Sequence, residues 1–180
     1  HAPLNFEPGK KAGYSNTDYY LLALILEQVT GETYEIYMQK NIWEPCGLQA
    51  TTCLEIGNLT CAPEGNEAYM AIGKACRGVG DMHSNLCDIL RWNRALLSGK
   101  VVDEAWLNEL LDLSEGFNCG FMDMGDGAMA TISMTEGYGA VDVIYQNNGE
   151  TFYLICMTSH ARSVLAVENM HEIILNYLNE

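Results

Sequence analysis

Basic residues and prolines are scarce in this sequence of 180 residues. Nine lysines and arginines stand against 24 aspartates and glutamates, which gives a formal charge of −15 at pH 7. A chain of this sign repels nucleic-acid phosphates and anionic membrane surfaces, so we expect no nucleic-acid partner. With four prolines and 48% hydrophobic residues, intrinsic disorder is excluded. The chain is therefore globular and long enough to bury a core.

Motifs for metals, nucleotides and membranes are also absent. The longest apolar run, Tyr19 to Leu26, is too short to span a bilayer. The four histidines lack a His-x₃-His spacing, the seven cysteines contain no Cys-x-x-Cys pair, and no glycine-rich phosphate loop occurs. We therefore expect no metal and no cofactor. Because the chain begins with His-Ala-Pro and not with Met, we expect a segment cut from a longer protein.

Thiols and thioethers are plentiful. The seven cysteines and nine methionines favour a reducing or anaerobic setting over an oxidising one. Most of the cysteines are expected to be small core residues. A disulfide between Cys53 and Cys61 stays open at this point, and so does the compartment.

Capping residues and apolar patterns predict helices in the first part of the chain. The first of them is apolar on nearly every face, which predicts a buried helix. Residues 49–80 hold several glycines and little periodicity, and are expected to be mostly loop. The predicted helices run from Ser15 to about Thr30, from Thr33 to about Ile42, from Ser84 to Leu97 with Leu86 facing inward, and from Asp103 to about Leu113.

The pattern changes to strands after residue 113. Strands are predicted over 117–123, 128–134, 139–146 and 151–158, and a final helix over 164–178. The turn Asn147-Asn148-Gly149 predicts a hairpin, because Asn and Gly adopt positive φ easily. Val141, Val143 and Tyr145 fall on one strand face, and the continuously apolar run 152–157 predicts a central strand. The predicted inner stripe of the final helix is Val167, Met170, Ile174, Tyr177 and Leu178.

This order of elements predicts an α+β fold. Residues 1–113 are expected to form a helical lobe, and residues 114–180 an antiparallel sheet with a C-terminal helix.

The segment from Phe6 to Leu22 carries the most distinctive motif. It reads Phe-Glu-Pro-Gly, then Tyr14-Ser15-Asn16 and Tyr19-Tyr20-Leu21-Leu22. It resembles the "F-x-P-G … Y-S-N-x-x-Y-x-L-L" segment of the serine β-lactamase and penicillin-binding-protein superfamily, particularly the class C β-lactamase and D-alanyl-D-alanine carboxypeptidase branch. The resemblance continues in the blocks 26–34, 42–51, 78–92 and 117–121.

This resemblance implies a β-lactamase/transpeptidase-like fold, represented here by its C-terminal part. It also implies that Tyr14 and Asn16 are catalytic: the tyrosine helps to move the proton of a nucleophilic serine, and the asparagine amide holds a carbonyl of the substrate. Taken without the flanking blocks, the same triplet is an ordinary helix start.

Two departures from the family pattern matter. No Ser-x-x-Lys motif, which carries the family's nucleophile, occurs in the 180 residues, so we expect it upstream. The third motif of the family, Lys/His-x-Gly, is replaced by Met134-Thr135-Glu136, with Gly137 after it. The resemblance makes these four residues substrate-binding. Met134 cannot hold a substrate carboxylate by charge, whereas the Thr135 hydroxyl and the Gly137 amide can still donate hydrogen bonds.

We therefore expect the C-terminal fragment of a bacterial serine hydrolase, which cleaves an amide or ester through an acyl-enzyme and is inactive as this segment alone. The alternative is a non-catalytic relative that binds a peptide or cell-wall fragment. Substrates would be small molecules or peptides. Members of the family are often extracytoplasmic. In the complete family fold N-terminal elements join the sheet, so we expect an uncovered strand edge that favours self-association.

Overall fold

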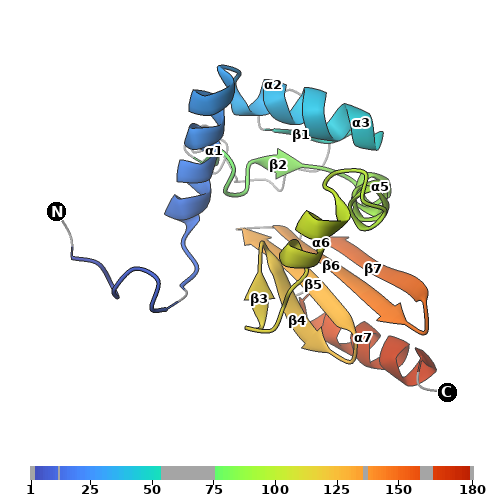
Figure 1. The fold of residues 1–180 in the computed structure, drawn as a ribbon. Helices are drawn as coiled ribbons and strands as arrows, with labels where there is room; N and C mark the ends of the chain where they lie inside the picture. The colour runs from blue at the N-terminus through green and yellow to red at the C-terminus, as the bar shows by residue number, and fades with distance from the viewer. Residues whose placement is uncertain (1–2, 12, 54–75, 136–137, 159–163, 179–180) are drawn as a thin grey trace.

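The computed structural model describes residues 3–11, 13–53, 76–135, 138–158 and 164–178 (Figure 1). Before residue 111, most of the regular structure among the described residues is helical. A five-stranded antiparallel sheet and a last helix, α7 (Val164–Leu178), follow. The described part therefore has the predicted α+β order, with helices first and the sheet second.

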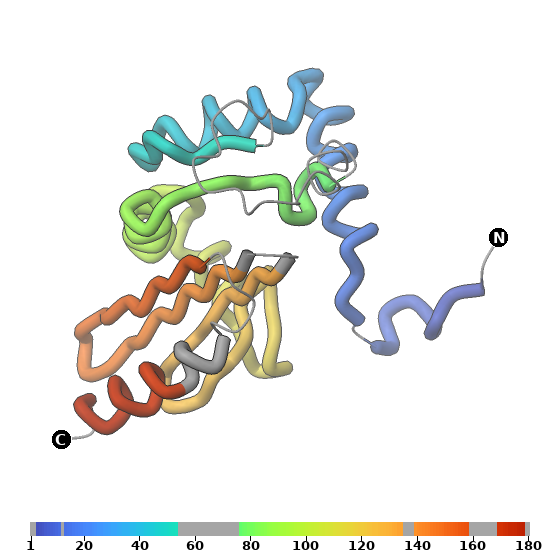
Figure 2. Tube along the Cα trace, turned by 180° about the vertical axis from the view of Figure 1, so that it is seen from behind, coloured from blue at the N-terminus to red at the C-terminus, as the bar shows by residue number. Residues whose placement is uncertain are grey.

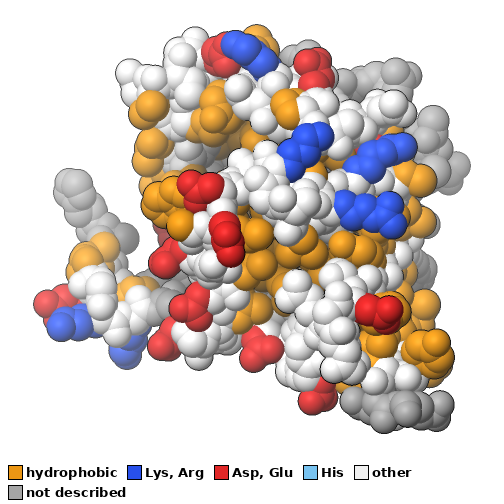
Figure 3. Space-filling view, turned by 45° about the vertical axis from the view of Figure 1, so that its right-hand side comes forward, with side chains coloured by type: hydrophobic (Ala, Val, Ile, Leu, Met, Phe, Trp, Pro, Cys, Tyr) orange, Lys and Arg blue, Asp and Glu red, His pale blue; other side chains and the backbone are white. Residues whose placement is uncertain are grey.

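Helix α1 spans Asn16–Thr30 and begins where the capping signal predicts. The hydroxyl of Ser15 accepts a hydrogen bond from the Asp18 amide at 3.3 Å, and Gly31 ends the helix in the left-handed region. The predicted burial of this helix is wrong. Ala23 alone of its residues is buried, because the other described elements cover one side of α1. Figure 3 shows hydrophobic side chains at the surface, and those of α1 that are about half exposed or more are Leu21, Leu22, Ile25 and Val29.

The second predicted helix is longer than expected. It consists of α2 (Tyr34–Met38), the π-helix η1 (Gln39–Trp43) and α3 (Glu44–Cys46), which follow one another without a break. The end expected near Ile42 therefore lies at Cys46. Pro45 does not stop the helix, because it occupies the first turn of α3, where its missing N–H is tolerated.

Helices α5 (Leu86–Leu97) and α6 (Glu104–Leu110) connect the first half of the chain to the sheet. Asp103 caps α6 as predicted, but the N-cap of α5 is Asn85 and not Ser84. Leu86, which was expected to face inward, is 49% exposed. The buried face of α5 instead carries polar and small residues beside its leucine, namely Asp88, Asn93, Ala95 and Leu96.

The sheet has the order β3-β4-β5-β6-β7, and every neighbouring pair is antiparallel. A separate pair joins β1 (Thr52–Cys53) to β2 (Met82–His83). The strands of the main sheet are β3 (Phe117–Asn118), β4 (Phe121–Gly125), β5 (Ala128–Thr135), β6 (Tyr138–Asn147) and β7 (Glu150–Thr158).

Positive φ angles are found in the turns of the tight hairpins, and two of these turns bear on the predictions. Asn148 and Gly149 have φ of 50° and 83°, which confirms the predicted turn between the last two strands. The single strand predicted over 117–123 is wrong. Cys119 and Gly120 have φ of 46° and 93° and fold this stretch into the hairpin of β3 and β4.

The apolar run 152–157 was predicted to be a central strand, which is wrong for the described strands. The run belongs to β7, which pairs with β6 and is the last strand in the order of the sheet. The run is apolar because both of its faces are covered. Phe152, Leu154 and Cys156 face the cluster beneath α7, and Tyr153 contacts the cluster beneath α5 and α6. Burial of two faces needs no neighbour strand on each side.

Helix α7 covers one face of the sheet, and α5 and α6 cover the other (Figures 1 and 2). The predicted alternation in β6 is confirmed, since Val141, Val143 and Tyr145 are buried beneath α7. The stripe predicted for α7 is partly wrong: Ile174 and Leu178 contact the sheet, as does Leu175, whereas Met170 and Tyr177 are exposed. The side chain of Val167 lies outside the described residues.

The described cysteines, which include Cys53, are free thiols. Cys61 itself lies outside the described residues. Within the described ranges, no helix is both long and apolar enough to cross a bilayer.

Asp88 ties α5 to the segment before β1. Its carboxylate accepts hydrogen bonds from the Ala50 amide (2.7 Å), the Thr51 hydroxyl (2.9 Å) and the Arg91 guanidinium (2.6 Å). Burial alone would raise the pKa of this carboxyl, but the hydrogen bonds together lower it below the ordinary value. The ionised form is therefore the one that this site stabilises.

We expect Asp88→Asn to lower the free energy of unfolding at pH 7 by about 2–4 kcal/mol, because buried donors lose their charged acceptor. The lowered pKa implies that the wild-type advantage is present above about pH 4 and is lost as the pH falls through the folded-state pKa. Urea unfolding at pH 7 and at a pH below the folded-state pKa of Asp88 measures this difference. The exposed Asp112 is the matched control, and an equal loss in Asp112→Asn would contradict the assignment.

Among the described residues, β7 has a paired strand on one side only, and this generates a second prediction, which concerns self-association. An unpaired strand edge pairs readily with a second copy, and a lysine placed on such an edge opposes pairing. Sedimentation velocity over a range of concentrations should therefore show dimers or larger species, reduced by Thr151→Lys. The control is Thr52→Lys, which adds the same charge on β1. A monomer at every concentration would exclude edge pairing.

Candidate active site

Tyr14 and Asn16 form a hydrogen-bonded pair at the start of α1. The Tyr14 hydroxyl donates to Oδ1 of Asn16 at 2.9 Å, and the Tyr14 side chain is 71% exposed. Ser15 between them caps the helix, which holds the backbone of the triplet in place. The structure thus joins the two residues that the motif marks as catalytic and leaves the phenol open to solvent. Their catalytic role stays a prediction.

A second tyrosine lies beside this pair. The rings of Tyr14 and Tyr19 are 5.7 Å apart between centroids, with 42° between their planes. Partial burial raises the pKa of Tyr19, and nearby Tyr14 and Cys119 add to the increase. The turn between β3 and β4 that carries Cys119 is therefore close to the start of α1. Sequence reasoning did not assign a role to Tyr19, although it stands at the second tyrosine of the quoted motif.

The end of β5 is the other half of the predicted site. In Figure 1 the end of β5 and the beginning of β6 lie at the end of the sheet that is nearer to α1. Met134 is 65% exposed and is opposite Gly139 in the register, and Thr135 is opposite Tyr138. Glu136 and Gly137, the remaining predicted substrate-binding residues, lie outside the described residues.

The side chains at the end of β5 do not share one face. Strand alternation puts Met134 on the face of Ala128 and Ala130, which pack beneath α7. Ser133 lies on the opposite face, with Met129, which packs beneath α5 and α6. Met134 therefore points away from helices α5 and α6, whereas Ser133 points toward their side of the sheet.

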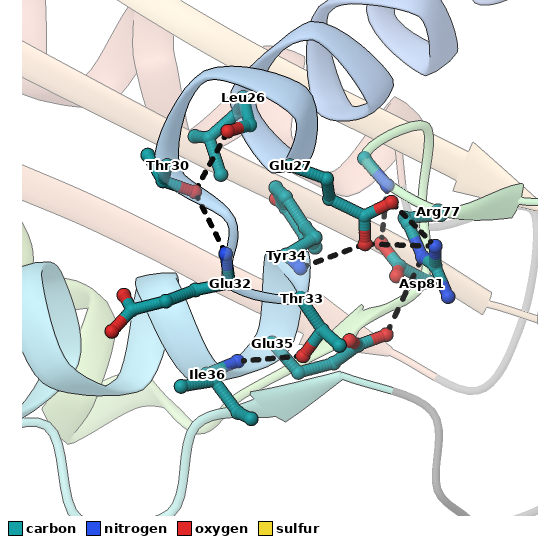
Figure 4. A network of polar contacts seen from close by, with 11 residues as sticks. Leu26, Glu27, Thr30, Glu32, Thr33, Tyr34, Glu35, Ile36, Arg77 and Asp81 are labelled. Carbon is teal, nitrogen blue, oxygen red and sulfur yellow. Dashed lines mark hydrogen bonds and ion pairs between the residues drawn. The ribbon is translucent and has the colours of Figure 1, made fainter.

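A polar network anchors the other end of α1 (Figure 4). The guanidinium of Arg77 lies 2.8 and 3.0 Å from the two oxygens of Glu27 and 3.5 Å from Glu35. Glu27 also accepts a hydrogen bond from the Tyr34 amide at 2.9 Å, and Asp81 accepts one from the Gly78 amide at 3.0 Å. The network connects α1, α2 and the turn before β2.

Burial controls the titratable groups around this network. It raises the pKa of the Asp81 carboxyl and of the Cys53 thiol, and nearby Asp81 raises that of Cys53 further. A thiol with a raised pKa is a poor nucleophile. Burial also lowers the pKa of His83, whose Nδ1 lies 3.1 Å from the Asp81 carbonyl oxygen. The carboxylates of Glu27 and Asp81 are engaged in these hydrogen bonds, and we interpret the network as a structural support for α1.

Metal ligands do not gather in the described part of the chain. No group of three or more His, Cys, Asp or Glu side chains is arranged there to hold an ion.

Comparison with known proteins identifies the family. The profile of the Beta-lactamase family matches residues 1–175, which is nearly the whole sequence. The chain belongs to the Beta-lactamase family. This membership confirms the resemblance drawn from the Tyr14-Ser15-Asn16 block and its neighbours.

Individual relatives of this Beta-lactamase family member agree. An Escherichia coli K12 protein with the provisional name D-alanyl-D-alanine carboxypeptidase is 45% identical over 49 residues, which are 27% of this chain and 11% of that protein. A penicillin-binding protein of Bacillus halodurans superposes with a TM-score of 0.76 at 16% identity, covering 97% of this chain and 59% of that one. A D-amino acid amidase of Ochrobactrum anthropi SV3, complexed with L-phenylalanine amide, gives 0.72 at 21% identity, covering 96% and 60%.

The two structural likenesses establish a β-lactamase/transpeptidase-like fold, as predicted. The chain spans less than two thirds of each of these relatives.

The exposure of Tyr14 leads to a stability prediction. We expect Tyr14→Phe to change the free energy of unfolding by less than about 0.5 kcal/mol, because the hydroxyl makes a single hydrogen bond at the surface. Thermal unfolding of the variant and of Tyr177→Phe, another exposed tyrosine, should therefore give nearly equal midpoints. A clearly lower midpoint for Tyr14→Phe alone would assign the hydroxyl to structure and not to chemistry.

Proposed function

We propose that this chain is the C-terminal part of a β-lactamase-family serine hydrolase, which cleaves an amide or ester through an acyl-enzyme. The proposal rests mainly on the hydrogen bond between Tyr14 and Asn16 at the exposed start of α1. The helix cap orients both side chains, and both are reachable from solvent. A site that positions a substrate and moves a proton at this helix end requires both properties.

The direction of that hydrogen bond suits both roles. The Tyr14 hydroxyl donates its own proton in the hydrogen bond to Oδ1 of Asn16. Its oxygen can therefore accept a hydrogen bond from a nucleophilic hydroxyl. The Nδ2 group of Asn16 is not used in this bond and can donate to a carbonyl of the substrate. In this proposal, one pair of residues contacts both the nucleophile and the substrate.

The reaction proceeds in two steps. The serine oxygen attacks the carbonyl carbon while its proton moves through Tyr14 to the leaving amine or alcohol, and the C–N or C–O bond breaks. Water then attacks the resulting ester, gives up a proton along the same route and releases the acid, which restores the serine. Backbone amides that face the developing oxyanion lower both barriers.

The nucleophile in this proposal lies outside the 180 residues. None of the seven serines is followed three residues later by lysine, which is the spacing that places both side chains on one helix face. We therefore propose that a Ser-x-x-Lys segment upstream supplies it.

The end of β5 bears on the substrate class. Residues 132–135 are Ile, Ser, Met and Thr, and none of them carries a positive charge. A substrate carboxylate would have no ionic partner on this stretch, whichever of these residues faces the substrate. We propose that the preferred substrate is an amide or ester without a carboxylate at that position.

Covalent labelling tests the proposal. The 180-residue chain should not label with a fluorescent fluorophosphonate, whereas the parent protein, extended through a Ser-x-x-Lys segment, should label at that serine. Tyr14→Phe in the parent should slow labelling by roughly 10²-fold or more, the usual contribution of a proton-transfer group. Labelling with a fluorescent penicillin should be much weaker, because the β5 end offers its carboxylate no charge.

The control is Tyr177→Phe in the parent, which should label at the wild-type rate. Stoichiometric labelling of the short chain would place the nucleophile within it and contradict the proposal. A parent with Ser-x-x-Lys that resists the fluorophosphonate would instead favour the non-catalytic, peptide-binding alternative.

A further inference from the structure

A buried carboxyl and a buried amide meet where α5 crosses the sheet. Nδ2 of Asn93 donates to Oδ1 of Asp142 at 2.8 Å. Asn93 is fully buried and Asp142 is 9% exposed. The other amide atom, Oδ1 of Asn93, is buried without a hydrogen-bond partner among the described residues. An orphaned buried acceptor costs about 1–3 kcal/mol, so this arrangement needs an explanation.

Asp142 has no cationic partner in the described structure. In the sheet register it stands between Thr131 of β5 and Ile155 of β7. The titratable and charged groups of the strands and helices on this side of the sheet are Tyr153 on β7, Asp123 on β4, Asp88, Arg91 and Arg94 on α5, and Glu104 and Glu109 on α6.

None of these groups compensates a charge on Asp142. Arg91 is paired with Asp88 at 2.6 Å, and Arg94 is exposed. Burial raises the pKa of Asp142 to about 6, and the hydrogen bond from Asn93 offsets only part of that increase. The site therefore favours the neutral carboxylic acid.

The neutral acid explains the orphaned atom. A protonated carboxyl has one O–H donor and one carbonyl acceptor, and a primary amide has the complementary pair. With the proton on the second carboxyl oxygen, Asp142 accepts from Nδ2 of Asn93 and donates to its Oδ1, and both side chains are satisfied. When the carboxyl is ionised, it has no proton to donate, and Oδ1 of Asn93 is left in a buried site without a donor.

We propose that Asp142 is protonated in the folded protein at mildly acidic pH and forms a two-hydrogen-bond acid–amide pair with Asn93, which makes the attachment of α5 to the sheet pH-sensitive. Loss of the proton to solvent breaks one of the two bonds and leaves a buried carboxylate. Because α5 also holds the segment before β1 through Asp88, the pair links the helical part of the chain to β6.

The sign of the effect follows from linkage. A carboxyl whose folded-state pKa lies near 6, above its ordinary 3.8, binds its proton more tightly in the folded state. Its contribution is fully present below about pH 4 and is lost as the pH rises through about 6. This direction is opposite to that of Asp88, so the two buried carboxyls of this region can be separated by experiment.

Unfolding by urea between about pH 4 and pH 8 tests the proposal. Asn at position 142 keeps both hydrogen bonds and cannot ionise, so Asp142→Asn should raise the folding equilibrium constant by up to about 10²-fold at pH 7 and leave it nearly unchanged at pH 4. The matched control is Asp126→Asn, an exposed turn residue with φ of 50°, which asparagine also tolerates. It should show no such dependence on pH.

A second measurement does not depend on a variant that folds. The infrared carbonyl band of a protonated carboxylic acid should be present in the wild-type protein at about pH 5 and should disappear by about pH 7. Carboxyl carbon NMR should assign the titrating group to Asp142. An Asp142 carboxyl that titrates near its ordinary value, or a gain in Asp142→Asn that is equal at pH 4 and pH 7, would overturn the proposal.

Discussion

The alternation of side chains along β6 is the constraint on which the other parts of the molecule depend. Val141, Val143 and Tyr145 face α7, and Ile144 packs on the opposite side beneath α5 and α6. A shift of one residue in the register would exchange these two sets and turn Asp142 toward α7. The same register brings Asp142 to Asn93. One strand thereby holds the last helix and the helical part of the chain on opposite sides of the sheet.

The candidate site lies at the edge of this framework. Tyr14 and Asn16 occupy the solvent-facing start of α1, whose other end is held by the pair of Glu27 and Arg77. The C-terminal end of α1 is thus held by the Arg77 network, and the N-terminal end, which carries the Tyr14 phenol, is open to solvent. This arrangement suits a site that receives a substrate and a nucleophile from outside the described residues. The network around Arg77 positions α1, and its carboxylates are engaged in that support.

Local signals predicted local structure. Ser15 and Asp103 cap helices, and the turn at Asn148 and Gly149 closes a hairpin, because each depends on the conformational preference of a few neighbouring residues. The left-handed conformation of Cys119 had no such signal, since cysteine does not favour positive φ, and the hairpin of β3 and β4 was missed. Tyr14 and Asn16 were predicted as site residues in the same way, from a short contiguous motif, whereas the contact of Tyr19 with Tyr14 became visible only in the structure.

The sequence by itself determined the family and the order of the elements, because both depend on motifs and signals made of residues close together along the chain. The tertiary structure decided which faces are covered. An apolar pattern states that burial is favourable but does not name the partner, so α1 was expected to be buried and is largely exposed. Only the register of β5 and β6 revealed that Met134 and Ser133 face opposite sides and that Asp142 meets Asn93, because contacts between distant segments are set by packing and not by local preference.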